Sequence, residues 1–321
     1  MAQQESPAKV KVTGFGQVGI VVKDVETVAR SYWNILGIGP WNIYSLEAPV
    51  LRDHMYHGKP AWAKAKIAQA QVGAVQLELY QPVEGDSICG DFLKKRGEWM
   101  HHISMFVDDA DATAAELVKE GFPCLESGRY GKDGAYYYID TKPLRTIWKV
   151  VQRPTSMGVE PIRIPETAQE SPAKVKVKEI GQVALIVKDA QLVGENYWLI
   201  LGIGPWQVIP FEPPMLHDRR YQGRPAWARE KLGIATVGGV GFELCQYVDG
   251  DSIYQDFLNE YGEGLQHFNF YVDNQDETAE ILTSQGFTSI RSGRRGPTGR
   301  SGNYIMIEPL HSIWELVERR R

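Results

Sequence analysis

Gly264-Leu265-Gln266-His267-Phe268-Asn269-Phe270-Tyr271-Val272-Asp273 is an aromatic-rich run with a single imidazole near its middle. Its aromatic residues and the closing Val are typical of a buried or half-buried β-strand. A similar run, Trp99-Met100-His101-His102-Ile103-Ser104-Met105-Phe106-Val107-Asp108, lies 165 positions earlier, counted from His102 to His267. Two copies of one strand predict two copies of whatever is built around it.

The rest of the chain repeats with the same spacing. Ser6 to Val12 recurs at Ser171 to Val177, and Leu36 to Trp41 recurs at Leu201 to Trp206. A period of about 165 residues is far longer than that of a solenoid repeat, so it indicates a duplicated domain. Between the copies, residues 154–172 contain four prolines and few apolar residues, which is typical of an extended linker. We therefore expect domains at 1–153 and 173–321.

Composition narrows the class of protein. The chain has 321 residues, 43% of them hydrophobic, with a net charge of −5 and a pI near 5.9. This charge offers no basic field for nucleic acid, and no apolar run is long enough for a membrane span. The first residues lack the features of a signal peptide, so we expect a cytoplasmic protein. The three cysteines, Cys89, Cys124 and Cys245, show no metal-knuckle spacing and are expected to be inert thiols.

Hydrophobic periodicity predicts the same order of elements in each copy. In the first copy, a strand at 15–22, a helix at 25–36 and three short strands up to residue 81 form one βαβββ unit. A short helix at 87–96 leads into a second unit, with a strand at 101–107, a helix at 110–120 and three strands up to residue 152. We expect an α+β fold of four such units. The polar stretches 52–54 and 217–220 are predicted to be solvated connections, with a substrate-contacting lid as the alternative.

This pattern resembles the vicinal oxygen chelate superfamily, which includes glyoxalase I, methylmalonyl-CoA epimerase, extradiol dioxygenases and bleomycin-resistance proteins. Gly16 to Val22 opens one unit and His101 to Asp109 opens the next. Residues 75–82 followed by 97–102 carry a local likeness to methylmalonyl-CoA epimerase. The resemblance implies paired units that curl into an open cup, with one side chain on each of four strands directed at a divalent metal ion.

In the second copy, the positions that match the metal ligands of the superfamily are Gln182, Glu243, His267 and Glu315. Three oxygen ligands and one nitrogen suit a single divalent ion such as Zn²⁺, Ni²⁺, Co²⁺ or Mn²⁺. A lone carboxylate in an apolar strand is costly to bury without a partner, and a cation would be such a partner. The competing interpretation is that these are outward-facing glutamates on edge strands.

In the first copy, the matching positions are Gln17, Glu78, His102 and Lys149. A protonated lysine cannot be a ligand, so its charge is expected to pair with Glu78 and to replace the cation. The site would then be a degenerate site or a binding cup, and a reactive, desolvated lysine is the alternative. Cups formed between the copies instead of within them would group Gln17 and Glu78 with His267 and Glu315.

The resemblance implies a metal-dependent isomerase, epimerase or lyase that removes a proton next to a carbonyl and stabilises the resulting enolate or enediolate on the metal. Glu315 is the first candidate for the base and Glu243 the second. The substrate would be a small carbonyl, carboxylate or thioester compound, and a homodimer is possible. The alternatives are a metal-free resistance-type binding protein and, less favoured, an iron(II) dioxygenase, because Gln17 and Gln182 take the place of one histidine.

Overall fold

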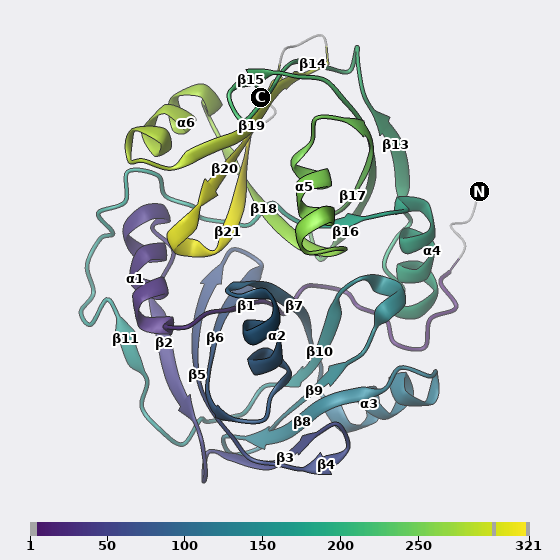
Figure 1. Cartoon of the computed structure of the whole chain (residues 1–321). Coiled ribbons are helices and arrows are strands. Elements are labelled where there is room, and N and C mark those ends of the chain that lie inside the picture. Colours follow the sequence, from purple (N-terminus) through teal and green to yellow (C-terminus); the bar gives the residue numbers. More distant parts are fainter. Residues whose placement is uncertain (1–4, 297–299, 319–321) are drawn as a thin grey trace. The chain divides into compact units, whose positions relative to one another are not determined.

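The computed structural model describes residues 5–296 and 300–318. Each copy folds into one curled sheet with helices packed against it, so the α+β prediction is confirmed (Figure 1). We call the two copies the N-terminal repeat and the C-terminal repeat. None of the described helices is long and apolar enough to cross a membrane.

The N-terminal repeat contains an eleven-stranded sheet and three α-helices. Its elements are β1 (Gln17–Val21), α1 (Val25–Leu36), β2 (Trp41–Leu46), β3 (Leu51–Tyr56), β4 (Lys59–Pro60), β5 (Ala63–Val72), β6 (Val75–Gly85), α2 (Ile88–Arg96), β7 (Trp99–Phe106), α3 (Ala110–Lys119), β8 (Cys124–Tyr130), β9 (Gly134–Ile139), the 3₁₀ turn η1 (Lys142–Leu144), β10 (Ile147–Gln152) and β11 (Ile162–Ile164).

The C-terminal repeat contains a ten-stranded sheet and repeats the order of elements up to the last long strand. Its elements are β12 (Gln182–Val187), α4 (Ala190–Leu201), β13 (Gln207–Phe211), β14 (Leu216–Tyr221), β15 (Arg224–Pro225), β16 (Ala228–Val237), β17 (Val240–Gly250), α5 (Ile253–Glu260), β18 (Gly264–Val272), α6 (Gln275–Ser284), β19 (Thr288–Arg295), β20 (Arg300–Ile307), the 3₁₀ turn η2 (Glu308–Leu310) and β21 (Ser312–Glu318).

Strand order shows how two units make one sheet. In the N-terminal repeat the first unit runs β2-β5-β6-β1 and the second runs β7-β10-β9-β8, and the units meet at the antiparallel β1–β7 pair. The C-terminal repeat meets in the same way at β12–β18. Since each sheet draws all its strands from one copy, each cup forms within a repeat and not between repeats. The alternative grouping of Gln17 and Glu78 with His267 and Glu315 is therefore wrong.

The helix ends follow from local sequence. The Asp24 side chain accepts hydrogen bonds from two backbone N–H groups at the start of α1, and Gly37 ends the helix at φ 66°, in the left-handed region that glycine tolerates. At α4, the Asp189 side chain accepts from one backbone N–H, that of Leu192, and Gly202 ends the helix at φ 68°. Helix α1 packs on β5 and β6, and α3 packs on β9 and β10. These helices cover the sheet and leave its other face to form the site.

The stretches predicted to be solvated connections are strands, so that prediction is wrong. Residues 52–54 lie in β3, which pairs with β8, and residues 217–220 lie in β14, which pairs with β19. The pairing register shifts within each of these strands, where Asp53 and Asp218 both have φ 49°. This irregularity interrupts the alternation by which a strand is recognised in sequence.

The compact units differ from the predicted boundaries. One unit is Gly14–Lys178, and the other combines residues from Glu179 onward with the segment that ends at Thr13. Val12 N–H donates to Leu201 O at 2.9 Å, and Val177 N–H donates to Leu36 O at 2.8 Å. Each copy of the repeated Ser-Pro segment thus packs on the helix of the other repeat. Part of the expected linker is also ordered, because β11 pairs with β2.

Candidate functional site

Four adjacent strands of the C-terminal sheet, β17-β12-β18-β21, carry the four candidate ligands. Glu243 and His267 both lie opposite Ala184, on either side of β12. Gln182 and Glu315 both lie opposite Asn269 of β18. The sequence-predicted set is therefore brought to one region of one sheet.

His267 is held in a defined orientation by its neighbour. The pairing register shifts next to His267, and its Nδ1 lies 3.0 Å from Gln266 Oε1. Gln266 in turn donates to Ile253 O at 3.0 Å, so the amide oxygen faces the ring and accepts the Nδ1 proton. Burial lowers the pKa of His267 to about 4, which leaves the ring neutral with a free lone pair on Nε2.

The Nε2 atom of His267 is buried and has no hydrogen-bond partner among the described residues. Its nearest acidic atom is Glu243 Oε2, at 3.9 Å. The ring stacks on Tyr254, with centroids 6.3 Å apart, and meets the edge of Tyr304 at 5.1 Å. A buried, oriented and unpartnered imidazole nitrogen is the arrangement that a metal ligand requires.

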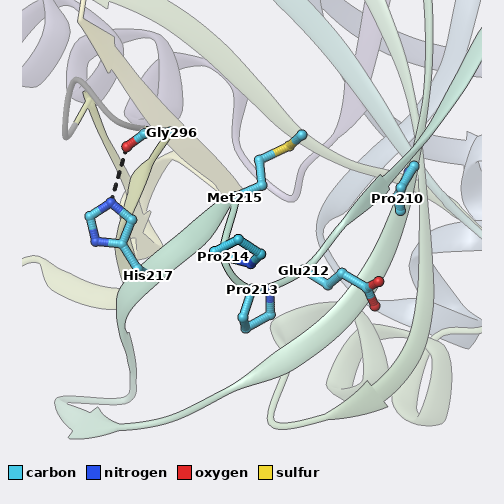
Figure 2. A pocket seen from close by; sticks show the side chains of 7 residues that line it. All are labelled: Pro210, Glu212, Pro213, Pro214, Met215, His217 and Gly296. Carbon is cyan, nitrogen blue, oxygen red and sulfur yellow. Dashed lines mark hydrogen bonds between the residues drawn. The ribbon is translucent and has the colours of Figure 1, made fainter.

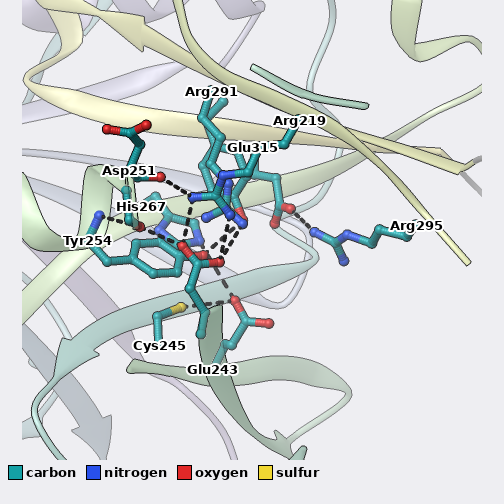
Figure 3. A network of polar contacts seen from close by, with 12 residues as sticks. Arg219, Glu243, Cys245, Asp251, Tyr254, His267, Arg291, Arg295 and Glu315 are labelled. Carbon is teal, nitrogen blue, oxygen red and sulfur yellow. Dashed lines mark hydrogen bonds and ion pairs between the residues drawn. The ribbon is translucent and has the colours of Figure 1, made fainter. Parts of the chain in front are cut away.

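The two acids of the site differ in their partners. Burial, and then the nearby Glu315, raise the pKa of Glu243 to about 7, and the Cys245 thiol donates to its Oε2 at 3.2 Å. Glu315 instead forms an ion pair with Arg295, whose side chain is 31% exposed (Figure 3). Two buried carboxylates next to each other raise the energy of the charged state, which a cation between them would lower.

The donor set fits a divalent ion. Atoms of Glu243, Cys245 and His267 lie within 4.8 Å of one another. The Gln182 Nε2 is also buried without a partner, and the opposite assignment of this amide would present its oxygen. Cys245 was not predicted as a donor, although its position two residues after Glu243 on the same strand places both on one face. Oxygen, nitrogen and sulfur donors together suit a borderline ion such as Zn²⁺ or Co²⁺.

A buried cluster of arginines was also missed from the sequence. Arg219 donates to both carboxylate oxygens of Glu230, at 3.1 and 2.9 Å, and Arg291 donates to Glu230 at 2.8 Å. All three side chains are at most 3% exposed. Arg219 lies in the stretch 217–220 that was predicted to be a solvated connection, and its burial shows that this prediction is wrong. Arg291 and Arg295 are four residues apart in a strand, a spacing that already places them on one face.

In the matching set of the N-terminal repeat, both carboxylate oxygens of Glu78 already accept hydrogen bonds from the chain. Glu78 Oε1 accepts from Lys149 Nζ at 2.7 Å and lies 3.3 Å from His102 Nε2. Its other oxygen accepts from Gln17 at 3.1 Å and from Gln69 at 3.2 Å. Burial acts to raise the pKa of Glu78, but Lys149 and His102 outweigh it and hold it well below its ordinary value. The expected pairing of Lys149 with Glu78 is present.

The N-terminal cup encloses only a small hollow. Its lining includes Tyr80, Tyr130, Tyr136, Tyr138 and Lys149, and its volume is about 20 Å³. The ammonium group of Lys149 lies 5.1 Å from the centre of the Tyr138 ring and 5.9 Å from that of Tyr136. A hollow of this volume has room for about one water molecule.

A second group of donor atoms lies beside this cup, formed by Cys89, His101 and His102. The Nδ1 atoms of the two histidines are 3.1 Å apart, and Cys89 Sγ is 3.7 Å from His101 Nδ1. Burial raises the pKa of the Cys89 thiol well above its ordinary value, which favours the protonated, inert form expected from the sequence.

A hollow of the C-terminal repeat lies at the loop between β13 and β14, with a volume of about 630 Å³. Its lining residues are Pro210, Glu212, Pro213, Pro214, Met215, His217 and Gly296 (Figure 2). None of the four candidate ligands lines it. Phe211, between two of the lining residues, instead has its ring 5.1 Å from the guanidinium of Arg295.

Comparison with known proteins identifies the family. The model of the Glyoxalase/Bleomycin resistance protein/Dioxygenase superfamily matches residues 16–138 and 181–305, which is most of both repeats. The chain belongs to this superfamily. The resemblance seen in the sequence, and the fold that it implied, are confirmed.

Two curated members are similar over part of the chain. Human mitochondrial methylmalonyl-CoA epimerase is 31% identical over 120 residues, which cover 36% of this chain and 60% of that protein. The uncharacterised protein YqjC of Bacillus subtilis is 30% identical over 87 residues, 27% of this chain and 52% of that protein. Both matches are shorter than either full protein.

A solved structure aligns over nearly the full length of the chain. A mutant 4-hydroxymandelate synthase from Streptomyces coelicolor aligns with a TM-score of 0.61, covering 97% of this chain and 94% of that chain. Its sequence identity is 14%, so the likeness concerns the fold and not the reaction.

Proposed function

We propose that the C-terminal repeat is the active centre of a divalent-metal-dependent isomerase, epimerase or lyase. The observation that carries this proposal is the buried Nε2 of His267, which is oriented by Gln266 and has no partner among the described residues. Glu243 and Gln182 lie on the strands beside it, and Glu315 lies on β21. These residues would hold one divalent ion per chain.

A divalent ion at such a site supplies electrostatic stabilisation to an oxygen atom that gains negative charge. Residues of the chain would act as the base and exclude water. Glu315 is the proposed base, because its carboxylate is paired with the partly exposed Arg295 on the approach to the site. Glu243 is the second candidate, since its Oε2 lies 3.9 Å from His267 Nε2, where it is placed to act as a ligand. Tyr254 and Tyr304 pack around the imidazole and exclude water from it.

The proposed reaction removes a proton from a carbon next to a carbonyl group and returns it, or expels a leaving group. The substrate would be a small carbonyl, carboxylate or thioester compound. Support for this class comes from the 31% identity to methylmalonyl-CoA epimerase over 120 residues. The N-terminal repeat would bind no metal, because Lys149 occupies the place of the cation beside Glu78.

Metal analysis tests the proposal. Purified chain loaded with Co²⁺ and dialysed is expected to retain one ion per chain. His267→Ala should weaken retention by about 100-fold or more, because a ligand is lost. His102→Ala, the matched change in the N-terminal repeat, should leave the bound cobalt unchanged. If a correctly folded wild-type chain retained no cobalt, the proposal would be wrong.

Proton exchange tests the roles of the acids. In D₂O, the loaded chain should exchange the proton next to the carbonyl of a substrate drawn from a panel of α-hydroxyketones and 2-substituted malonyl thioesters. Glu315→Gln should lower this rate by at least about 100-fold while cobalt remains bound. Glu308→Gln, an exposed control in η2, should leave it unchanged. If Glu243→Gln abolished exchange and Glu315→Gln did not, the two roles would be reversed.

A metal-free binding protein is the second candidate. The tyrosine-lined hollow beside Lys149 favours it, although at about 20 Å³ this hollow would have to open before it could accept a drug-sized ligand. An iron(II) dioxygenase is less favoured, because His267 is the one histidine at the four ligand positions of the C-terminal repeat.

A further inference from the structure

Two arginines of β19 face the candidate site. Arg291 and Arg295 are four residues apart on one strand, and Arg291 is 3% exposed. The Phe211 ring lies 6.0 Å from the guanidinium of Arg291 and 5.1 Å from that of Arg295. Arg295 also pairs with Glu315 of the site (Figure 3). These contacts place both positive charges beside the proposed ligands.

Arg291 has more hydrogen-bonding capacity than its partners use. Its guanidinium donates to Glu230 at 2.8 Å and lies 4.7 Å from the ring centres of both Tyr254 and Tyr304. Its Nη1 is buried and has no partner in the described part of the chain. Buried arginine N–H groups without acceptors are costly, so this atom points to a group that is not part of the chain.

The charge of Arg291 is not balanced within its cluster. Glu230 already receives two hydrogen bonds from Arg219, so two arginines share one carboxylate. Farther along β19, Arg295 shares the site with Glu315 and Glu243. If the acids are counted as ionised and His267 as neutral, the positive and negative charges of this set balance. The set consists of Arg219, Arg291, Arg295, Glu230, Glu243 and Glu315. A divalent ion added to this set leaves a buried excess of two positive charges, which requires an anion.

The N-terminal repeat lacks this feature. Arg291 pairs across the sheet with Tyr221, and the corresponding pair in the N-terminal repeat is Glu126 with Tyr56. Arg295 pairs with Leu216, and the corresponding residue is Tyr130, which pairs with Leu51. The arginines are therefore not a requirement of the shared fold. They belong to the cup whose glutamate, Glu243, has no lysine partner among the described residues, whereas Glu78 is paired with Lys149.

We propose that Arg291 and Arg295 form an anion-binding subsite that selects substrates with a carboxylate group, and most strongly small dicarboxylates or their mono-thioesters. The inference rests on the proposed function, since the excess charge arises when a divalent ion is bound. Arg295 then exchanges its pairing with Glu315 for the carboxylate of the substrate. Arg291 donates to the same carboxylate through its free Nη1.

Calorimetry on the cobalt-loaded full chain tests the subsite with malonate and malonamide. These probes share a skeleton and differ in charge. Malonate should bind at least about 100-fold more tightly than malonamide, because its carboxylates can coordinate the cobalt and also accept charge-assisted bidentate hydrogen bonds from arginine. The contribution of the arginine is the part that Arg295→Gln removes. Arg295→Gln should weaken malonate binding by about tenfold or more and leave malonamide binding and cobalt content unchanged.

Arg294→Gln is the matched control. It removes the same charge from the same strand, but Arg294 pairs with the exposed Asp276 at 3.4 Å. Its malonate affinity should stay within about twofold of wild type. Arg295 is chosen over Arg291 because a side chain that is 31% exposed can be replaced without leaving Glu230 buried beside a single arginine.

The outcomes separate the two proposals. If cobalt binds and the chain does not prefer malonate to malonamide, the subsite is wrong and the proposed function stands. The same holds if Arg295→Gln weakens both probes equally, or if Arg294→Gln has as large an effect. If the folded chain takes up no cobalt, the proposed function is wrong, and the charge argument fails with it.

Discussion

Each repeat places a glutamate at the equivalent point of its own sheet, but the two glutamates have different hydrogen-bond partners. Glu78 receives hydrogen bonds from Lys149, Gln17 and Gln69. Glu243 receives one hydrogen bond, from the Cys245 thiol. A carboxylate that the chain satisfies needs no external cation, whereas one that the chain leaves open can bind one. The difference shows that a shared fold can satisfy a buried glutamate or leave it open, depending on a few neighbours.

Small changes around the glutamates produce this difference. In the N-terminal repeat, Gln17 donates to Gln76 at 2.7 Å, but Gly241 stands at the matching place and Gln182 is left with an unpartnered amide nitrogen. Ile234 likewise replaces Gln69, which removes a donor to the carboxylate.

The histidines differ for a steric reason. A Cβ at Gly19 would lie 2.0 Å from the His102 ring, so that ring lies directly over the glycine. In the C-terminal repeat this position is Ala184, and the His267 ring cannot lie there. His102 Nε2 is accordingly 3.3 Å from Glu78, whereas His267 Nε2 is 3.9 Å from Glu243. Neither Nε2 atom has a hydrogen-bond partner among the described residues, so the repeats differ in the wider separation between His267 and its glutamate.

Removal of Lys149 should give the largest change in stability. Lys149→Met leaves Glu78 buried without its cation and should lower the free energy of unfolding by about 3 to 5 kcal/mol. Lys149→Met combined with Glu78→Gln should recover most of this loss. Arg295→Met, the matched change in the C-terminal repeat, should cost less because Arg295 is 31% exposed. Urea unfolding of the metal-free chain measures all three.

A loss below about 1 kcal/mol for Lys149→Met would contradict the comparison, because Lys149 would then not be what satisfies the buried carboxylate.

Glu126 should make the N-terminal repeat sensitive to pH. Its carboxyl is 2% exposed, accepts from Ile88 N–H at 2.8 Å, and occupies the place of Arg291. Burial raises the pKa of Glu126 from 4.5 to about 7 in the folded chain. Its contribution to stability is therefore full below pH 4.5 and is lost as the pH rises through about 7.

Between pH 5 and pH 8 wild type should lose about 2 to 3 kcal/mol more free energy of unfolding than Glu126→Gln, because the variant has no carboxyl group to ionise at this position. Urea unfolding at pH 5 and pH 8 gives the measurement. If wild type and variant lost the same stability between these pH values, another group would be responsible.

Substitutions in the two repeated Ser-Pro segments should give the smallest change in stability. Ser171 donates to Trp33 O and accepts from Ala173 N–H, and Ser6 forms the same contacts with Trp198 and Ala8. Ser171→Ala should weaken the N-terminal repeat by about 1 kcal/mol, and Ser6→Ala should weaken the C-terminal repeat by the same amount. Hydrogen exchange in α1 and α4 distinguishes them. A Ser6→Ala effect confined to α1 would contradict the assignment of the segments.

Much of the site could be predicted because strand position follows from sequence. The repeat and the His102 and His267 strands rest on alternation and on a spacing of about 165 residues, and the two sets of four residues were implied by the resemblance to the superfamily. Arg219 and Arg291 escaped prediction because their burial depends on Glu230, which lies on another strand. A charged residue in an irregular strand resembles a solvated loop until its partner is known.

The sequence by itself determined the duplication and the order of elements, because these depend on local periodicity and residue type. Its resemblance to the superfamily implied the break in the ligand pattern at Lys149. Tertiary structure alone decided that each cup forms within one repeat, that the Ser-Pro segments pack on opposite repeats, and that Arg295 meets Glu315. Such facts depend on which distant strands pair, and the chain's own alternation carries no information about a partner far away in sequence.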